Sequence, residues 1–177
     1  MKLQATSISD AWVIESDRRA DERGTFSTLF AGDFFHAQGL QKRFLQTCIS
    51  TNERKGTLRG MHWQEAPHGE VKVVHCIRGA IHDVILDLRP GSPTFRRWHA
   101  EVLSADSDRG LYIPVGCAHG YQTLTDDAWV LYQISAPHVP ASARGVRWND
   151  DAFGIQWPVC DARVISARDA TYPDFHE

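Results

Sequence analysis

Short runs of β-branched and aromatic residues, separated by closely spaced turn signals, restrict the fold of this chain more than any other feature. Gly, Pro and Asp gather at residues 21–24, 78–79, 90–93, 114–116 and 125–127. The runs between them predict strands over residues 71–77, 81–88, 98–103, 111–114 and 128–134. Residues 31–39 predict a short helix that ends at Gly39. Many short strands and few helices indicate an all-β fold, either a jelly-roll sandwich or a related barrel.

Two polar residues lie within the predicted strands on otherwise apolar faces. Side chains in a strand alternate between its faces, so Lys72 shares a face with Val74 and Cys76. In the same way, Tyr132 shares a face with Ala128, Val130 and Ile134. A small barrel can hold a ligand when its interior is not filled, and both residues are predicted to point into such a cavity. Spacing alone leaves open that Lys72 faces solvent.

Composition excludes several classes of function. The net charge of −3 and the lack of a basic cluster argue against nucleic-acid binding. No apolar run has the length of about 20 residues that a membrane-spanning helix needs. The first ten residues do not form a signal peptide, so the four separated cysteines are expected to be reduced and the location to be cytoplasmic. The length of 177 residues fits one domain, residues 1–177.

Three segments carry an ordered set of motifs. GTLRGMH occupies residues 56–62 and is followed by Lys72 and by DVILDLR at residues 83–89. PVGCAHG occupies residues 114–120, and SARD closes the set at residues 166–169. In this order, and with DERGTF at residues 21–26, the motifs resemble the dTDP-4-dehydrorhamnose 3,5-epimerase family over nearly the whole chain. The resemblance implies a cupin-type jelly roll with a few short helices and a homodimer with exchanged amino-terminal strands.

The resemblance also implies a reaction that uses side chains alone, without metal or other cofactor. The family removes a proton beside a 4-keto group of a nucleotide-linked 6-deoxyhexose and returns a proton on the opposite face. An imidazole with an ordinary pKa of about 6.5 suits the base, and this role falls on His62 with Asp169 as its partner. Lys72 stabilises the enolate, and Tyr132 is the acid.

The same resemblance assigns substrate binding to further positions. A guanidinium forms paired hydrogen bonds with phosphate oxygens, which makes Arg59 and Arg23 the expected diphosphate anchors. The predicted substrate-binding residues are Arg23, Gln46, Arg59, Lys72, His119, His138 and Arg168. The expected substrate is a nucleotide sugar with dTDP as the first choice, in deoxysugar or rhamnose biosynthesis.

Several residues depart from the commoner family pattern. Trp63 follows His62 in place of Tyr or Phe, Tyr121 stands in place of Phe, and His138 in place of Tyr. Cys117 also replaces a Phe, while Thr28 and Cys48 stand where Glu and Asn are common. These changes leave open which nucleotide and keto sugar are bound, and whether C3, C5 or both are inverted.

Two alternatives belong to other classes of function. A metal-dependent cupin needs about three protein ligands, but His62 and His68 lack the paired His of the cupin metal motif, and His119 stands alone. A non-catalytic sugar-nucleotide binder would have been indicated by loss of a catalytic residue. All four are present: His62, Lys72, Tyr132 and Asp169.

Overall fold

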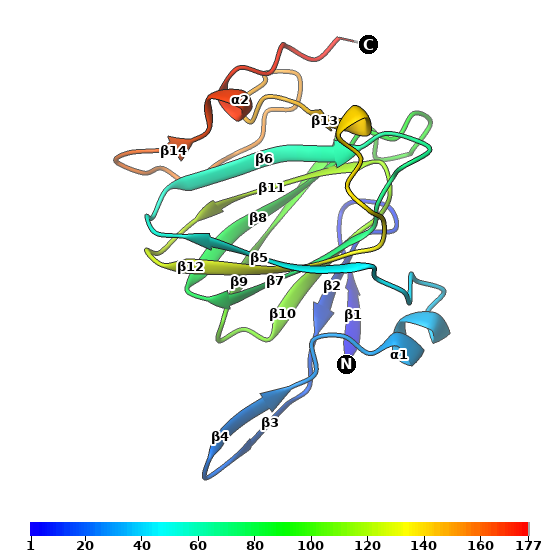
Figure 1. Ribbon diagram of the computed structural model, residues 1–177, viewed down its shortest axis with the longest axis vertical. Coiled ribbons are helices and arrows are strands. Elements are labelled where there is room, and N and C mark those ends of the chain that lie inside the picture. Colours follow the sequence, from blue (N-terminus) through cyan, green and yellow to red (C-terminus); the bar gives the residue numbers. More distant parts are fainter. Residues whose placement is uncertain (177) are drawn as a thin grey trace.

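The computed structural model describes residues 1–176, and two β-sheets facing each other form its body (Figure 1). The first, called the β12 sheet, has the order β1 (Lys2–Ala5), β2 (Trp12–Glu15), β10 (Arg109–Ile113), β7 (Lys72–Arg78), β12 (Ala128–Ile134), β5 (Gln46–Asn52). The second, called the β6 sheet, has the order β13 (Ala143–Gly145), β6 (Thr57–Gln64), β11 (Cys117–Thr123), β8 (Ala80–Asp87), β9 (Trp98–Ser104). The pairs along both sheets are antiparallel, and β14 (Val164–Ile165) adds a short parallel pair to β6. This sandwich confirms the predicted all-β fold.

The remaining elements are short. A hairpin of β3 (Arg18–Asp21) and β4 (Gly24–Ser27) extends away from the sandwich (Figure 1). The helices are α1 (Gly32–Ala37), the 3-10 helix η1 (Pro140–Ser142) and α2 (Ala167–Ala170). Within residues 1–176, none of them has the length and apolar character to cross a bilayer.

The predicted elements correspond to observed ones with nearly the same bounds. The five predicted strands are β7, β8, β9, β10 and β12, and the predicted helix is α1, followed by Gly39 at φ 72°. The central strand β11 was not predicted, because its sequence CAHGYQT is rich in small and polar residues. Every residue of β11 is nevertheless buried, because β6 and β8 pair with its two edges.

The main core lies between the two sheets. Val74 and Cys76 of β7 belong to it, and Tyr132 packs against it. Lys72 points the same way and is only 9% exposed, so the alternative that it faces solvent is wrong. The predicted inward orientation of Lys72 and Tyr132 is confirmed. All four cysteines are free.

The outer faces of both sheets are also covered. Residues Val146, Phe153 and Ile155 pack on the β6 sheet, against Met61 and Leu86. An aromatic cluster around Phe35 of α1 packs on the β12 sheet. Because both outer faces carry apolar cover, the sheets are fixed and the polar side chains between them gain a rigid frame.

Candidate active site

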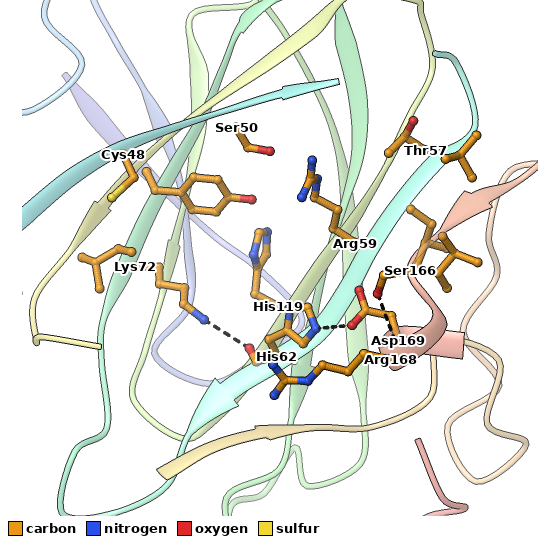
Figure 2. A pocket seen from close by; sticks show the side chains of 15 residues that line it. Cys48, Ser50, Thr57, Arg59, His62, Lys72, His119, Ser166, Arg168 and Asp169 are labelled. Carbon is orange, nitrogen blue, oxygen red and sulfur yellow. Dashed lines mark hydrogen bonds and ion pairs between the residues drawn. The ribbon is translucent and has the colours of Figure 1, made fainter. Parts of the chain in front are cut away.

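A cavity of about 680 Å³ opens between the sheets, and polar side chains from both sheets and from α2 line it (Figure 2). The predicted site residues on its wall are Arg59, His62, Lys72, His119, Tyr132, Arg168 and Asp169. A smaller cavity of about 250 Å³ adjoins it, with Gln46 and His138 on its wall. His62, Lys72 and Arg168 line both cavities. The fold therefore brings nine of the ten predicted residues together, and the tenth is Arg23.

Gly60 lets Arg59 and His62 face the same cavity. Residues three apart in a regular strand point to opposite faces, but the register of β6 against β11 shifts beside this glycine. Gly60 has φ 130°, and a Cβ there would lie 2.5 Å from the Cα of Gly120. Only glycine tolerates both the positive φ and the close approach of the two backbones. The spacing Arg-Gly-Met-His thus follows from the packing of β6 on β11.

His62 forms the first imidazole–carboxylate pair of the site. Its Nε2 lies 2.7 Å from Oδ1 of Asp169, and Oδ2 of that carboxylate accepts the Gly60 N–H at 3.3 Å (Figure 2). Burial raises the pKa of Asp169, but the hydrogen bonds from His62 and Gly60 outweigh it and the net shift is downward from 3.8. The side chain of His62 is 41% exposed and that of Asp169 only 7%. A substrate can therefore reach the imidazole, while the carboxylate behind it stays ionised and orients the ring.

His119 forms a second pair of the same kind. Its Nε2 bonds Oδ1 of Asp83, and both side chains are buried. The His119 ring also meets Tyr132 edge-on, with ring centroids 5.8 Å apart. The β6 sheet thus brings two imidazoles to the wall of the main cavity, each with its own carboxylate.

Lys72 supplies the predicted positive charge on the cavity wall. Its Nζ lies 2.9 Å from Oε1 of Glu70 and donates to the backbone oxygen of His62 at 3.1 Å. Figure 2 shows the second contact, which ties the ammonium to the strand that carries the histidine. The ammonium is therefore held at a fixed place beside His62.

Tyr132 approaches the cavity from the opposite sheet. Burial raises its pKa well above 10.0, and the nearby Tyr121 and Asp83 add to the shift. Tyr132 therefore stays protonated throughout the neutral range and can donate a proton there.

A network of hydrogen-bonded side chains joins Tyr121 to Arg59. The hydroxyl of Tyr121 lies 2.9 Å from Oγ of Ser50 and donates to Oδ1 of Asn52 at 3.2 Å. The same Oδ1 accepts from Nε of Arg59 at 2.9 Å. The guanidinium of Arg59 is thereby anchored through Nε, which leaves its terminal nitrogens for an anion.

Arg23 does not reach the cavity of its own chain. It lies on the β3–β4 hairpin, its side chain is 82% exposed, and it pairs with Asp21 at 2.6 Å. The exposed Phe26 lies on the same hairpin. Arg23 therefore lines neither cavity of its own chain, so within one chain it cannot have the predicted substrate-binding role.

Sequence reasoning missed several polar residues of the site. Glu70 stands two positions before Lys72, and alternation would have placed both on one face. Asp83 lies in a motif that was recognised, but nothing in the sequence linked it to His119. Ser50 and Asn52 are short polar residues that only the pairing of β5 with β12 brings near the cavity.

The donor set does not resemble a metal centre. Among residues 1–176, no three His, Cys, Asp or Glu side chains come together as ligands. Nε2 of His62 and Nε2 of His119 are each engaged by a carboxylate, of Asp169 and Asp83 respectively.

Fold and cavity together define a class of protein. A jelly-roll sandwich with an oriented imidazole on one sheet, a neutral phenol on the facing sheet and an ammonium near the imidazole suits an enzyme that moves a carbon-bound proton. Epimerases belong to this class.

The comparisons with known proteins identify the family. The family model described as dTDP-4-dehydrorhamnose 3,5-epimerase matches residues 5–177. A dTDP-4-dehydrorhamnose 3,5-epimerase of Sinorhizobium fredii is 36% identical over 177 residues, which is 100% of this chain and 91% of that protein. The chain therefore belongs to the dTDP-4-dehydrorhamnose 3,5-epimerase family and is an isomerase.

Solved structures agree with this assignment. The dTDP-4-dehydrorhamnose 3,5-epimerase of Bacillus anthracis, with TDP and PPi bound, has a TM-score of 0.94 and 36% identity, covering 98% of this chain and 99% of that one. ChmJ of Streptomyces bikiniensis, a 3'-monoepimerase in complex with dTDP-quinovose, has a TM-score of 0.89 and 36% identity, covering 95% and 85%. Both two-centre and one-centre epimerases are thus among the similar proteins.

Proposed function

We propose that this chain epimerises a dTDP-linked 4-keto-6-deoxyhexose at C3, C5 or both, in deoxysugar or rhamnose biosynthesis. The observation that carries the proposal is the placement of His62 and Tyr132 on facing sheets of one cavity. Inversion needs a proton to leave one face of a carbon and another to arrive at the opposite face. Residues 1–177 would act as one catalytic domain.

The first step removes the proton beside the ketone. His62 Nδ1 is free of Asp169, which engages Nε2, so Nδ1 is the nitrogen that takes the proton. The electrons of the C–H bond form a C=C bond between this carbon of the sugar and the ketone carbon. The C=O bond becomes a single bond, and its oxygen carries the negative charge of the enolate. Asp169 stabilises the imidazolium, and Lys72 stabilises the enolate oxygen.

The second step returns a proton from the other side. Tyr132 donates its phenolic proton to the carbon, the C=O bond re-forms, and the configuration at that carbon is inverted. Solvent then restores the proton of Tyr132 and removes that of His62. Arg59 and Arg168 hold the diphosphate during both steps, and Gln46, His119 and His138 contact the rest of the substrate.

We further propose that the chain works as a homodimer in which Arg23 serves the partner's cavity. The exposure of Arg23 and Phe26 on a hairpin that extends from the sandwich supports this arrangement (Figure 1). A hairpin that exposes a large apolar side chain and an anion-binding guanidinium is more consistent with contact with a partner subunit than with exposure to solvent.

Product analysis tests the reaction. Purified protein is supplied with a dTDP-linked 4-keto-6-deoxyglucose, and the configuration at C3 and C5 is followed by NMR. Inversion at one or both carbons supports the proposal, and the number of inverted carbons separates a two-centre enzyme from a one-centre enzyme. Binding of the sugar nucleotide without any inversion would overturn it in favour of a non-catalytic binder.

Subunit complementation tests the shared site. Arg23→Ala and His62→Asn chains, each inactive as a homodimer, are co-expressed so that mixed dimers form. Random assembly should give about a quarter of the wild-type activity, because half of the dimers then hold one complete cavity. Mixed samples as inactive as the single variants would show that Arg23 serves its own chain. An active Arg23→Ala homodimer would show that Arg23 serves no site.

A further inference from the structure

A buried ion pair joins Glu70 to Lys72 at the boundary of the two cavities. Oε1 of Glu70 lies 2.9 Å from Nζ of Lys72, and the two side chains are only 8% and 11% exposed. Glu70 lines the smaller cavity, while Lys72 lines both. The carboxylate thus approaches the ammonium from the side away from the main cavity.

The ammonium has a fixed number of donors, and two of them are already used. A lysine Nζ carries three N–H groups. One is directed at Glu70, and a second donates to the backbone oxygen of His62 at 3.1 Å. The tetrahedral geometry of Nζ then sets the direction of the third. Since Lys72 forms part of the main cavity wall, this third N–H is the one that can serve a substrate oxygen.

The charge of Glu70 has two opposing effects on this site. A buried ammonium without a partner is strongly destabilising, and the carboxylate removes that cost. The same negative charge lowers the positive potential that an enolate would experience. A residue that only raised the positive potential would not be an acid. Glu70 therefore serves the ammonium by offsetting the cost of its burial and by orienting it.

We propose that Glu70 is a positioning residue for the reaction and acts through Lys72. It holds the ammonium so that one N–H points at the oxygen on which negative charge develops, and the His62 carbonyl fixes the same group relative to the base. This inference rests on the proposed function, because it requires Lys72 to face the enolate oxygen.

Four variants test the proposal: Glu70→Gln, Glu70→Ala, Lys72→Met and the double variant Glu70→Ala/Lys72→Met. The assay is the rate of solvent deuterium entry beside the ketone, with the KM of the sugar nucleotide and the Kd of dTDP measured alongside. Lys72→Met should lower the rate about 10²–10³-fold, as loss of an oxyanion donor does. Glu70→Ala should lower kcat about tenfold or more with KM and Kd little changed. Glu70→Gln should recover much of the loss, because its amide oxygen still accepts from Nζ.

The double variant decides whether Glu70 acts through Lys72. If it does, Glu70→Ala adds no further loss once Lys72 is methionine. A loss in the double variant equal to the sum of the single losses, expressed as free energies, would overturn the proposal. Glu101→Gln is a matched control, because Glu101 also forms a partly buried ion pair, with Arg109 at 2.9 Å, outside the two cavities. It should keep the wild-type rate.

The remaining outcomes separate this proposal from the proposed function. Wild-type exchange in Glu70→Ala together with a large loss in Lys72→Met would overturn the role of Glu70 and leave the mechanism intact. Wild-type exchange in Lys72→Met would instead overturn the role of the ammonium in the mechanism. If Glu70→Ala does not fold, judged by thermal unfolding, then Glu70→Met, which fills the space without accepting from Nζ, supplies the same comparison in the presence and absence of Lys72.

Discussion

On the β6 sheet each imidazole of the cavity is paired with a carboxylate, whereas the phenol of Tyr132 on the β12 sheet packs against the apolar core. Asp169 and Asp83 orient His62 and His119. Tyr132 has apolar neighbours, and burial raises its pKa and keeps it neutral. The comparison shows how one cavity can hold a base ready to accept a proton and an acid that keeps its own.

The largest effect should come from removing the base. His62→Asn should lower deuterium entry beside the ketone by about 10⁴-fold, because general base catalysis and the stabilised imidazolium are lost together. Binding of dTDP and the unfolding temperature should change little. His99→Asn is the matched control, because His99 pairs with Glu101 at 3.2 Å on β9, away from the cavity. Normal exchange in His62→Asn would show that His62 is not the base.

Removing the acid should give a smaller and different defect. Tyr132→Phe should slow formation of inverted product about 10²–10³-fold, while deuterium exchange without inversion falls less. The reason is that His62 can still remove a proton and return a deuteron to the same face. Tyr112→Phe removes another buried hydroxyl, one that accepts from the Gln41 N–H at 3.2 Å, and should be active. Product formation at the wild-type rate in Tyr132→Phe would contradict the assignment.

A weaker effect should follow from changing the support of the acid. Tyr121→Phe removes the hydroxyl that contacts Ser50 and Asn52 and that acts electrostatically on Tyr132. Loss of one hydrogen bond costs about 1 kcal/mol, so kcat for product formation should fall up to about tenfold. Deuterium exchange should fall less than product formation, as for Tyr132→Phe. If exchange falls more than product formation, Tyr121 supports the base and not the acid.

The smallest perturbation is a change of pH, which tests whether the buried phenols stay neutral. Burial raises the pKa of Tyr112, Tyr121 and Tyr132, so these three should keep their protons as the pH passes 10.0 in the folded protein. Ultraviolet titration of phenolate should therefore show at most one of the four tyrosines ionising near its ordinary pKa before unfolding begins. Tyr132→Phe should leave that early phase unchanged. An early phase that disappears in Tyr132→Phe would show that Tyr132 is not kept neutral.

Much of this arrangement could be predicted from the sequence, for identifiable reasons. Alternation predicted that Lys72 and Tyr132 share faces with apolar residues of their strands, but for Lys72 spacing alone left solvent exposure open, and only its burial in the structure decided the orientation. His62 and Asp169 lie more than 100 positions apart, so only the ordered family motifs could join them, and their 2.7 Å contact agrees with that resemblance.

Other features depend on tertiary packing that no local pattern reports. The strand β11 has a sequence of low β-propensity and forms because β6 and β8 pair with both of its edges. The contact of Tyr121 with Asn52 joins β11 to β5, which are far apart in the chain. The role proposed for Arg23 in a partner's cavity is likewise reported by no local pattern, and within residues 1–176 its guanidinium pairs with Asp21 on the same hairpin.

Tracing the origin of the incoming hydrogen tests the two-sheet mechanism most directly. Enzyme equilibrated in heavy water and present in excess over the 4-keto sugar nucleotide is stopped within one turnover, and each inverted carbon is examined by NMR. Because one group removes the hydrogen and another delivers a different one, every inverted carbon should carry deuterium from the first turnover onward. Inverted product that still holds its original hydrogen would mean that a single group does both, and the mechanism with a base and an acid on facing sheets would be wrong.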